Sequence, residues 1–429
     1  MLRVVQLGDE EREVRSALDA RELHRACARG GLRRGLVEWG RRGGGASPRF
    51  FDILGAGSTF TRASEASYYT QPPTDDEGDV AGKAFLAWAV ANTPRMDARD
   101  GVPMLLFEGA RTNYHTTSRD LGSYTIGVAP TITTNTDGAP DGDASSVRAE
   151  CPLDDYYYKS TSALTTGQPY IISQWLRGVS GQTLPMVTRY SPGPDGASIV
   201  GQPPTTTWRR EKVQRTPTGT ALNGYVNDGR NTSGIGGLVA GARDGMMAMP
   251  QVEGGSAATG QFATSFIRTT GVIATRATDR LSFAGGAWPR SMVTGGVEVV
   301  FRPIPSSAEI AAGSTTMYLF SFKSGSTERV SFVGTGGNVF FSVSANNVSV
   351  ISQIVTWAAG AELRVVLRPD ANTATLSGFL TGNGTYTSGA TWASFWQASY
   401  DANDNLHIGT SVTGVNAMFG RFAQRWRLP

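Results

Sequence analysis

The sequence is poor in residues that build covalent cross-links, metal sites and membrane spans. Its 429 residues include 2 cysteines and 3 histidines. Cys27 and Cys151 lie too far apart to suggest a disulfide framework, and the scattered histidines argue against a metal site. No apolar run approaches the ~20 residues that a bilayer span needs. Charged residues after Leu7 interrupt any signal-peptide core. We therefore predict no cofactor, metal or membrane insertion, and synthesis in a cytoplasm without a cleavable export signal.

Charge is scarce as well. Charged residues make up 17% of the chain and the formal net charge is +3. This balance gives no general attraction to nucleic acid, so we predict no nucleic-acid partner. An acidic turn at 71–79 does not have the spacing of a helix–loop–helix calcium site, and a solvated loop is favoured over bound calcium. Its acidic residues are Asp75, Asp76, Glu77 and Asp79.

Glycine, serine and threonine are plentiful, with 53 glycines in the chain. They separate short apolar runs, a pattern that favours strands and tight turns over long helices. We predict an all-β protein with two tandem antiparallel β-sandwiches, or jelly rolls, preceded by a short helical N-terminal anchor. The predicted divisions are a helical anchor and linker at 1–49, a jelly roll with an N-terminal extension at 50–284, and a second sandwich at 285–429.

The second sandwich is predicted from nine strand-like runs after residue 295. Several of them alternate apolar and polar residues, as at Val297, Val299 and Phe301. Alternation with a period of two indicates a strand with one buried face. Antiparallel sheets of this kind need protected edges, and packing between subunits commonly provides that protection.

The N-terminal arm is the one convincing helical stretch. Acidic residues gather at the start of 8–40 and arginines at its end, as the helix dipole favours. GRRGGGASP at 40–48 reads as a flexible linker. Two interpretations remain open: an anchor that packs against another protein, and a helical cap on its own chain.

Two distant stretches, 103–113 and 249–283, carry matching polar residues. The first contains Glu108 and Arg111, and the second contains Glu253, the strand-like run SFIRTT and Arg276. Buried carboxylates and guanidinium groups need partners, and arginine favours bidentate ones. We predict that the two stretches close one domain, edge against edge, with Glu108–Arg111 and Glu253–Arg276 as structural ion pairs.

No catalytic signature accompanies these residues. The carboxylates after residue 285 do not form a pair on one predicted strand, as a glycoside hydrolase would need. No histidine has a serine or cysteine partner in a nucleophile-elbow context. We therefore predict that the protein is not an enzyme.

The stretch 391–405 is a candidate glycan-binding site, because aromatic rings stack on sugars and polar groups beside them fix orientation. The alternative is that its large aromatic residues are core or trimer contacts and that DANDN is a turn. The candidate residues are Trp392, Trp396, Tyr400, Asp401 and Asn403.

Over residues 58–283 the order and spacing of short motifs resembles a family of phage virion proteins. The motifs include TFTRASEASYY, NTPRMD, GVPMLLFEGARTN, APDG and TTTWRR. Phe266 stands where that family often has tyrosine. The residues that carry the resemblance are Arg62, Pro94, Arg95, Glu108, Arg111, Asn113, Pro140, Asp141, Trp208, Gln251, Glu253, Ser265 and Ile267.

The resemblance implies a carbohydrate-binding-module-like jelly roll of tail fibres, minor tail proteins and head-attached fibres. The unit after it looks like a concanavalin-A-like or laminin-G-like domain. We therefore expect a virion structural protein: a projecting tail fibre that contacts host surface glycan, as a homotrimer, and attaches to other virion proteins through residues 1–49. The alternatives are a capsid-attached head fibre or decoration protein, and a surface-polysaccharide depolymerase.

Overall fold

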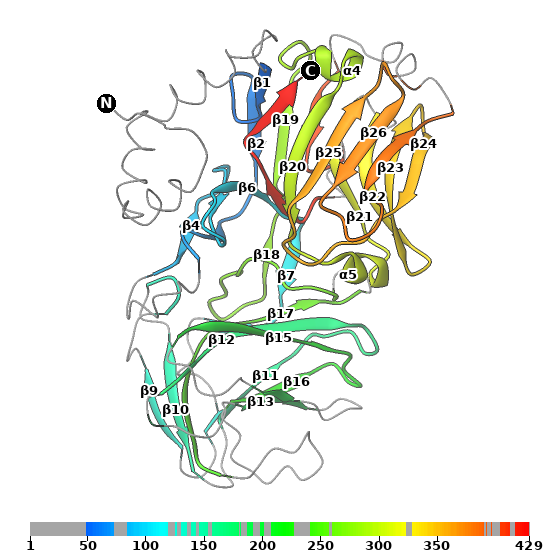
Figure 1. The fold of residues 1–429 in the computed structure, drawn as a ribbon. Coiled ribbons are helices and arrows are strands. Elements are labelled where there is room, and N and C mark those ends of the chain that lie inside the picture. Colours follow the sequence, from blue (N-terminus) through cyan, green and yellow to red (C-terminus); the bar gives the residue numbers. More distant parts are fainter. Residues whose placement is uncertain are drawn as a thin grey trace, which may run out of the picture.

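The computed structural model is an all-β protein built from two β-sandwiches, which confirms the predicted fold class (Figure 1). Two short helices, α4 (Ser291–Thr294) and α5 (Ser307–Ala312), occur in the part of the chain that the structure describes. No described helix has the length and apolarity to cross a membrane. The helical anchor predicted before residue 49 lies outside the described residues, which are 49–72, 84–118, 125–126, 130–134, 139–142, 146–152, 157–179, 181, 187–191, 198–200, 207–226, 241–256, 260–322, 328–389, 392, 396, 404–411 and 417–428.

The larger unit, here called the C-terminal sandwich, packs a nine-stranded sheet against a seven-stranded one (Figure 1, top). The nine-stranded sheet contains β27 (Gly384–Thr387), β26 (Thr373–Ser377), β25 (Leu363–Arg368), β20 (Val297–Pro303), β29 (Gly420–Phe422), β6 (Met104–Phe107), β5 (Met96–Asp97), β30 (Arg425–Leu428) and β1 (Arg49–Asp52). The seven-stranded sheet runs in the order β2 (Ser58–Thr61), β19 (Arg280–Phe283), β28 (Leu406–Ile408), β21 (Thr316–Phe322), β22 (Glu328–Thr335), β23 (Asn338–Ala345) and β24 (Val348–Ile354).

Alternating side chains build the core of this sandwich. Val297, Val299 and Phe301 of β20 are fully buried, and the residues between them are only partly buried, which confirms the predicted alternation. Phe301 meets Phe332 of the opposite sheet with ring centroids 5.4 Å apart. Because successive side chains of a strand point to opposite faces, each strand contributes every second residue to this core.

The second unit, here called the inserted sandwich, packs a seven-stranded and a five-stranded sheet around a smaller core (Figure 1, bottom). Its seven-stranded sheet contains β15 (Arg209–Arg215), β12 (Tyr170–Gly178), β17 (Arg243–Gly254), β10 (Val147–Cys151), β9 (Thr131–Thr134), β7 (Arg111–Asn113) and β18 (Ala274–Arg276). Its five-stranded sheet contains β14 (Ser198–Val200), β13 (Val187–Ser191), β16 (Leu222–Val226), β11 (Tyr157–Thr161) and β8 (Thr125–Ile126).

The strands β12 and β17 are buried on both faces. Leu176 and Met247 point into the core of the inserted sandwich. Trp175 and Met246 point the other way, into a third apolar cluster that also includes residues of the hairpin β3 (Ala66–Tyr69) and β4 (Leu86–Ala89). A strand covered on both sides reads as a continuous apolar run instead of an alternating one.

The predicted boundary at 284/285 does not match the sheets. Five strands from the range predicted as jelly roll, namely β1, β2, β5, β6 and β19, hydrogen-bond within the sheets of the C-terminal sandwich. The inserted sandwich is therefore an insertion into the larger one, entered after β6 and left before β19. A strand's own residue pattern shows that one face is buried, but it does not identify the distant strand that pairs with it.

The insertion is joined to the C-terminal sandwich by β7 and β18, which run antiparallel between the two units (Figure 1). We call these strands and the flanking residues 108–113 and 260–279 the neck. Asn113 of β7 is in register with both Glu253 and Ala274. Of the stretches 103–113 and 249–283, predicted to close one domain edge against edge, residues 111–113 and 274–276 do pair in the inserted sandwich, whereas β6 and β19 belong to the C-terminal sandwich.

Candidate functional site at the neck

The centre of the neck is a segment without regular structure, 264–267, whose backbone is held by side chains. Glu108 accepts a hydrogen bond from the Ser265 N–H at 2.7 Å, and Gln251 accepts one from the Ile267 N–H at 2.6 Å. Asn113 donates to the Ile267 carbonyl at 2.8 Å. Buried backbone groups must find partners, and here three polar side chains replace a neighbouring strand. SFIRTT, predicted as strand-like, is therefore not a strand.

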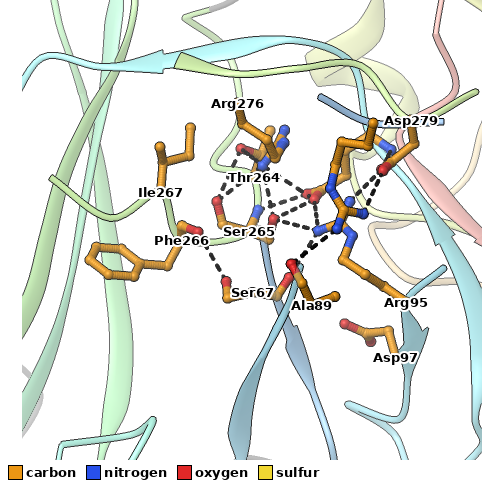
Figure 2. Close-up of polar contacts among 12 residues, drawn as sticks. Ser67, Ala89, Arg95, Asp97, Thr264, Ser265, Phe266, Ile267, Arg276 and Asp279 are labelled. Atoms are coloured by element: carbon orange, nitrogen blue, oxygen red, sulfur yellow. Dashed lines mark hydrogen bonds and ion pairs between the residues drawn. The ribbon is translucent and has the colours of Figure 1, made fainter. Parts of the chain in front are cut away.

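A buried cluster of charges lies beside this segment (Figure 2). Arg95 donates to Glu108 and to the Ser67 carbonyl, each at 2.8 Å, and also to Asp279. Asp279 accepts from Arg62 at 3.1 Å and from the Glu108 backbone N–H at 2.9 Å. All four charged side chains are fully buried. Such a cluster is tolerated in a low-dielectric interior only because each charge has an opposite partner.

Arg276 of β18 joins the cluster to the second strand of the neck. Its Nη1 lies 3.3 Å from a carboxylate oxygen of Glu108 and donates to the Ser265 hydroxyl at 2.8 Å. Its Nη2 donates to the Gly109 carbonyl at 2.8 Å. One guanidinium thus connects the entering chain, the central segment and the leaving chain.

The electrostatics of Glu108 follow from these contacts. Burial alone would raise the pKa of Glu108. Arg276, Arg95 and the Ser265 hydrogen bonds outweigh burial and hold the pKa of Glu108 far below its usual range. The carboxylate therefore stays ionised, because the charged form is the one that its neighbours stabilise.

Arg111 has a different environment. Its guanidinium lies between two aromatic rings, 4.9 Å from the centroid of Phe262 and 4.5 Å from that of Phe419. Its Nε and Nη2 are buried and make no hydrogen bond. Burial lowers the pKa of Arg111 to about 10, against attraction by Glu253. Stacking on ring faces is the interaction that compensates its desolvation.

The predicted ion pairs are therefore wrong in their partners, although three of the four residues lie in the neck and Glu253 of β17 contacts it. Glu108 pairs with Arg276 and Arg95 instead of Arg111. Glu253 accepts hydrogen bonds from the Thr264 backbone N–H at 3.0 Å and from its hydroxyl, and forms no ion pair with Arg276. Residues three apart in an extended chain point to opposite faces, which separates Glu108 from Arg111.

These contacts make the neck a structural joint. Glu108 and Asp279 are fully buried and each contacts two arginines, so neither carboxylate is placed to transfer a proton to a substrate. Among the described residues, no three His, Cys, Asp or Glu side chains gather as a metal ion would require. The acidic residues Asp75, Asp76, Glu77 and Asp79 lie outside the described part.

The predicted glycan site needs correction at its tryptophans. Trp392 and Trp396 are fully buried in the core of the C-terminal sandwich, with ring centroids 4.8 Å apart. Trp396 donates to the Ser344 carbonyl at 3.0 Å. Rings without an exposed face cannot stack on a sugar, so the core interpretation applies to both. Tyr400, Asp401 and Asn403 lie outside the described residues.

A half-buried ring that was not among the predicted site residues is Trp88 of β4. Its indole N–H donates to Asp141 at 3.3 Å, and the Arg268 guanidinium lies 4.3 Å from its ring centroid. Glu65 is 3.8 Å from Arg268. Trp88 is surrounded by apolar residues in FLAWAV, so the sequence around it reads as core. In the sequence, Asp141 of the APDG motif is the residue that could have indicated a polar partner for Trp88.

No protein-family model matches the sequence, and no curated protein matches it. Solved structures include a tailspike protein of bacteriophage CBA120, at 11% identity and TM-score 0.23, over 33% of this chain and 21% of the tailspike domain. The xylan-binding domain CBM22-1 of Paenibacillus barcinonensis Xyn10C matches at 13% identity and TM-score 0.24, over 34% of this chain and 94% of the domain.

The tandem CBM22-1–CBM22-2 domain of the same Paenibacillus protein matches at 9% identity and TM-score 0.25, over 73% of this chain and 96% of the tandem. The chain thus spans about a fifth of the tailspike domain and nearly all of the two Xyn10C segments. TM-scores this low mark local likeness among β-sheets and assign no ligand or activity to this chain.

Proposed function

We propose that this chain is a bacteriophage virion structural protein that projects from the particle as a tail fibre and contacts host surface glycan. The observation that carries the proposal is the meeting of distant motif residues at one joint. Arg62, Arg95, Glu108, Asn113 and Ser265 carry the resemblance to phage virion proteins, and all of them form hydrogen bonds with residues of the neck. Motif residues that meet at one joint support a structural unit in common with the phage virion proteins more strongly than the same short motifs do when they are taken separately.

The joint suits a projecting protein. A fibre must transmit force between its attachment and its tip, and two chain crossings held by buried ion pairs resist bending better than a flexible linker. In this proposal residues 1–49 attach to other virion proteins, and the chain acts without catalysis. A capsid-attached head fibre or decoration protein is the alternative, and the same joint suits it equally.

Glycan contact is assigned to the surface around Trp88. The Arg268 guanidinium covers one face of the Trp88 ring and Phe266 packs against the ring, but the half-buried ring keeps an exposed part. This exposed part, with the Asp141 carboxylate at the indole N–H, combines apolar surface with polar groups, which is the chemistry that binds sugars. Asp141 and Glu65 supply acceptors for sugar hydroxyls. Buried Trp392 and Trp396 have no part in this assignment.

Location on the particle tests the structural role. Immunogold labelling of the full-length protein should place it at the tail tip. Label over the capsid would exclude the tail-fibre proposal and favour the head-fibre or decoration alternative. Absence of label from purified particles would contradict both.

Binding to an array of bacterial surface glycans tests the ligand. Trp88→Ala should weaken binding about tenfold or more, because the exposed part of the aromatic ring is lost as a contact for the sugar. Trp396→Phe serves as the matched control, since that ring is buried elsewhere. Equal binding by wild type and Trp88→Ala would contradict the assigned surface. Release of reducing sugar from host polysaccharide would instead establish a depolymerase.

A further inference from the structure

One part of the nine-stranded sheet is rich in arginine. The neighbouring strands β1, β30, β20 and β25 together carry six arginines, one aspartate and one glutamate. In the whole chain, by contrast, basic and acidic residues nearly balance, at 39 and 36. Arg302 is neutralised by its contacts with Asp100 and Glu362. The other five arginines leave this margin of the C-terminal sandwich with an excess of positive charge (Figure 1).

An exposed aromatic ring lies beside these arginines. Phe50 of β1 is the direct neighbour of Arg427 of β30, and Arg427 is in turn the direct neighbour of Glu298 of β20. Trp426 is fully buried in the core, so the next residue, Arg427, points to the outer face of the sheet. Phe50 is 54% exposed. The outer face therefore presents apolar ring surface next to a guanidinium.

One carboxylate positions two of the guanidinium groups. Arg364 Nη2 lies 2.5 Å from Glu298 Oε1, and Arg427 Nη1 lies 3.9 Å from Glu298 Oε2. The Glu298 side chain is 16% exposed, whereas those of Arg364 and Arg427 are 48% and 54% exposed. Neither arginine forms another ion pair or hydrogen bond among the residues that the structure describes. Most of their N–H donors therefore remain available to a ligand.

Arg425 adds a third guanidinium to this face. It lies two residues before Arg427 in β30 and is exposed, so both side chains point the same way. Its neighbour in register is Asp52, whose carboxylate accepts a hydrogen bond from the Leu54 N–H at 2.9 Å and another from Gln424. Within the described part of the chain, Arg425 forms no ion pair. Three guanidinium groups thus surround one carboxylate in direct contact.

We propose that this surface, here called the arginine face and formed by Phe50, Glu298, Arg364, Arg425 and Arg427, binds a small phosphate ester that carries a ring next to its phosphate group. A phosphate group has about 1.5–2 negative charges at pH 7 and three acceptor oxygens, so it can bind more than one guanidinium. The ring of the ester packs against the exposed part of Phe50. A carboxylate brings less charge and fewer acceptor oxygens, and the arginine face binds it more weakly.

Calorimetric titration of the full chain tests this chemistry with four probes: phenyl phosphate, inorganic phosphate, benzoate and phenol. Phenyl phosphate should bind most tightly, because it alone combines a ring with a phosphate group. Added sodium chloride should weaken its binding, since exposed charges are screened by salt. Phenol, which lacks the anionic group, should show no measurable binding.

Two substitutions separate the contributions of charge and ring. Arg427→Gln should weaken the binding of phenyl phosphate about tenfold, because a charge-assisted hydrogen bond is lost. Phe50→Ala should weaken it about fivefold and leave the binding of inorganic phosphate unchanged. Arg209→Gln is the matched control, because Arg209 is an exposed arginine of β15 in the inserted sandwich. It should bind phenyl phosphate as the wild type does.

Both substituted side chains are exposed, so the variants are expected to fold, and circular dichroism checks that they do. The proposal is overturned if wild type does not bind phenyl phosphate at millimolar concentration, or if Arg427→Gln weakens binding no more than Arg209→Gln does. Equal affinity for phenyl phosphate and inorganic phosphate would overturn the role of Phe50. This inference does not depend on the glycan surface at Trp88 or on a place in a virion, so its failure would leave the proposed function standing.

Discussion

Arg111 and Arg276 are direct neighbours across the β7–β18 ladder, yet their guanidinium groups have opposite surroundings. Arg276 faces the carboxylate of Glu108, whereas Arg111 is stacked between the rings of Phe262 and Phe419. Like charges placed directly opposite in a sheet repel each other. The repulsion contributes to the lowered pKa of Arg111, after the larger effect of burial.

Because of this difference, the same substitution is predicted to change the free energy of unfolding much more at Arg276 than at Arg111. Arg276→Met removes a partner of buried Glu108 and should lower the free energy of unfolding by about 3–5 kcal/mol. Arg111→Met replaces a desolvated charge that has no ion pair by an apolar side chain of similar length. It should change stability by less than about 1.5 kcal/mol, because the volume is nearly conserved. Urea unfolding of the full chain measures both values.

Each variant is the control for the other, because both change arginine to methionine in the same ladder. Equal losses at the two positions would show that stacking on Phe262 and Phe419 stabilises the neck as much as the ion pair does. Such a result would contradict the distinction drawn between the two arginines.

Gly109 is predicted to tolerate no side chain. A Cβ at this position would lie 2.6 Å from Phe419 Cζ and 3.2 Å from Ala417 Cβ. Gly109→Ala should therefore cost about 1–3 kcal/mol, as overpacking does in cores. Gly219→Ala is the matched control, because nothing lies within 4 Å of its Cβ position. Thermal unfolding should separate the two variants, and combining Gly109→Ala with Phe419→Leu should restore part of the loss.

Several parts of this fold are readable from the sequence. Alternation in β20 predicts a half-buried strand because the pleat has a period of two. The closure of the inserted sandwich is predicted by carboxylates and arginines at both ends of the insertion, since buried charges need partners. The sequence does not reveal that β1, β2, β5, β6 and β19 pair with strands of the C-terminal sandwich, because the residue pattern of a strand does not identify the strand it pairs with.

The site was harder to predict than the fold. Residues Glu108, Arg111, Glu253 and Arg276 are correctly placed at one joint, but which carboxylate meets which guanidinium depends on side-chain direction. The segment at 264–267 has a strand-like pattern, and only the positions of Glu108, Gln251 and Asn113 show that side chains replace the neighbouring strand. Aromatic residues at 391–405 illustrate a further limit: composition does not distinguish a ring in a core from a ring in a binding site.

Trp396 is predicted to matter for stability and not for glycan binding. Trp396→Phe removes ring volume from the core and the hydrogen bond to the Ser344 carbonyl, which should cost about 1–3 kcal/mol. Calorimetry of the full chain measures the loss, and the glycan array measures binding. Weaker glycan binding with an unchanged melting temperature would restore Trp396 as a ligand contact.

Asp100 is predicted to make the protein sensitive to acid. It accepts hydrogen bonds from Arg421 and Arg302 of the C-terminal sandwich. Burial alone would raise the pKa of Asp100, but the two arginines lower it from 3.8 to about 2. The carboxylate therefore binds its proton less tightly in the folded than in the unfolded state. Its contribution to stability is complete above pH 3.8 and is lost as the pH falls to about 2.

The substitution Asp100→Asn should therefore destabilise the protein at neutral pH and flatten the dependence of unfolding free energy on pH between 3.8 and about 2. Glu108 still contributes to the remaining slope, because its pKa is also lowered. Denaturant unfolding across this pH range measures both slopes. Asp370→Asn, at an exposed carboxylate, is the control and should leave the slope unchanged. A slope unaffected by Asp100→Asn would mean that water screens the arginine contacts of this partly exposed carboxylate.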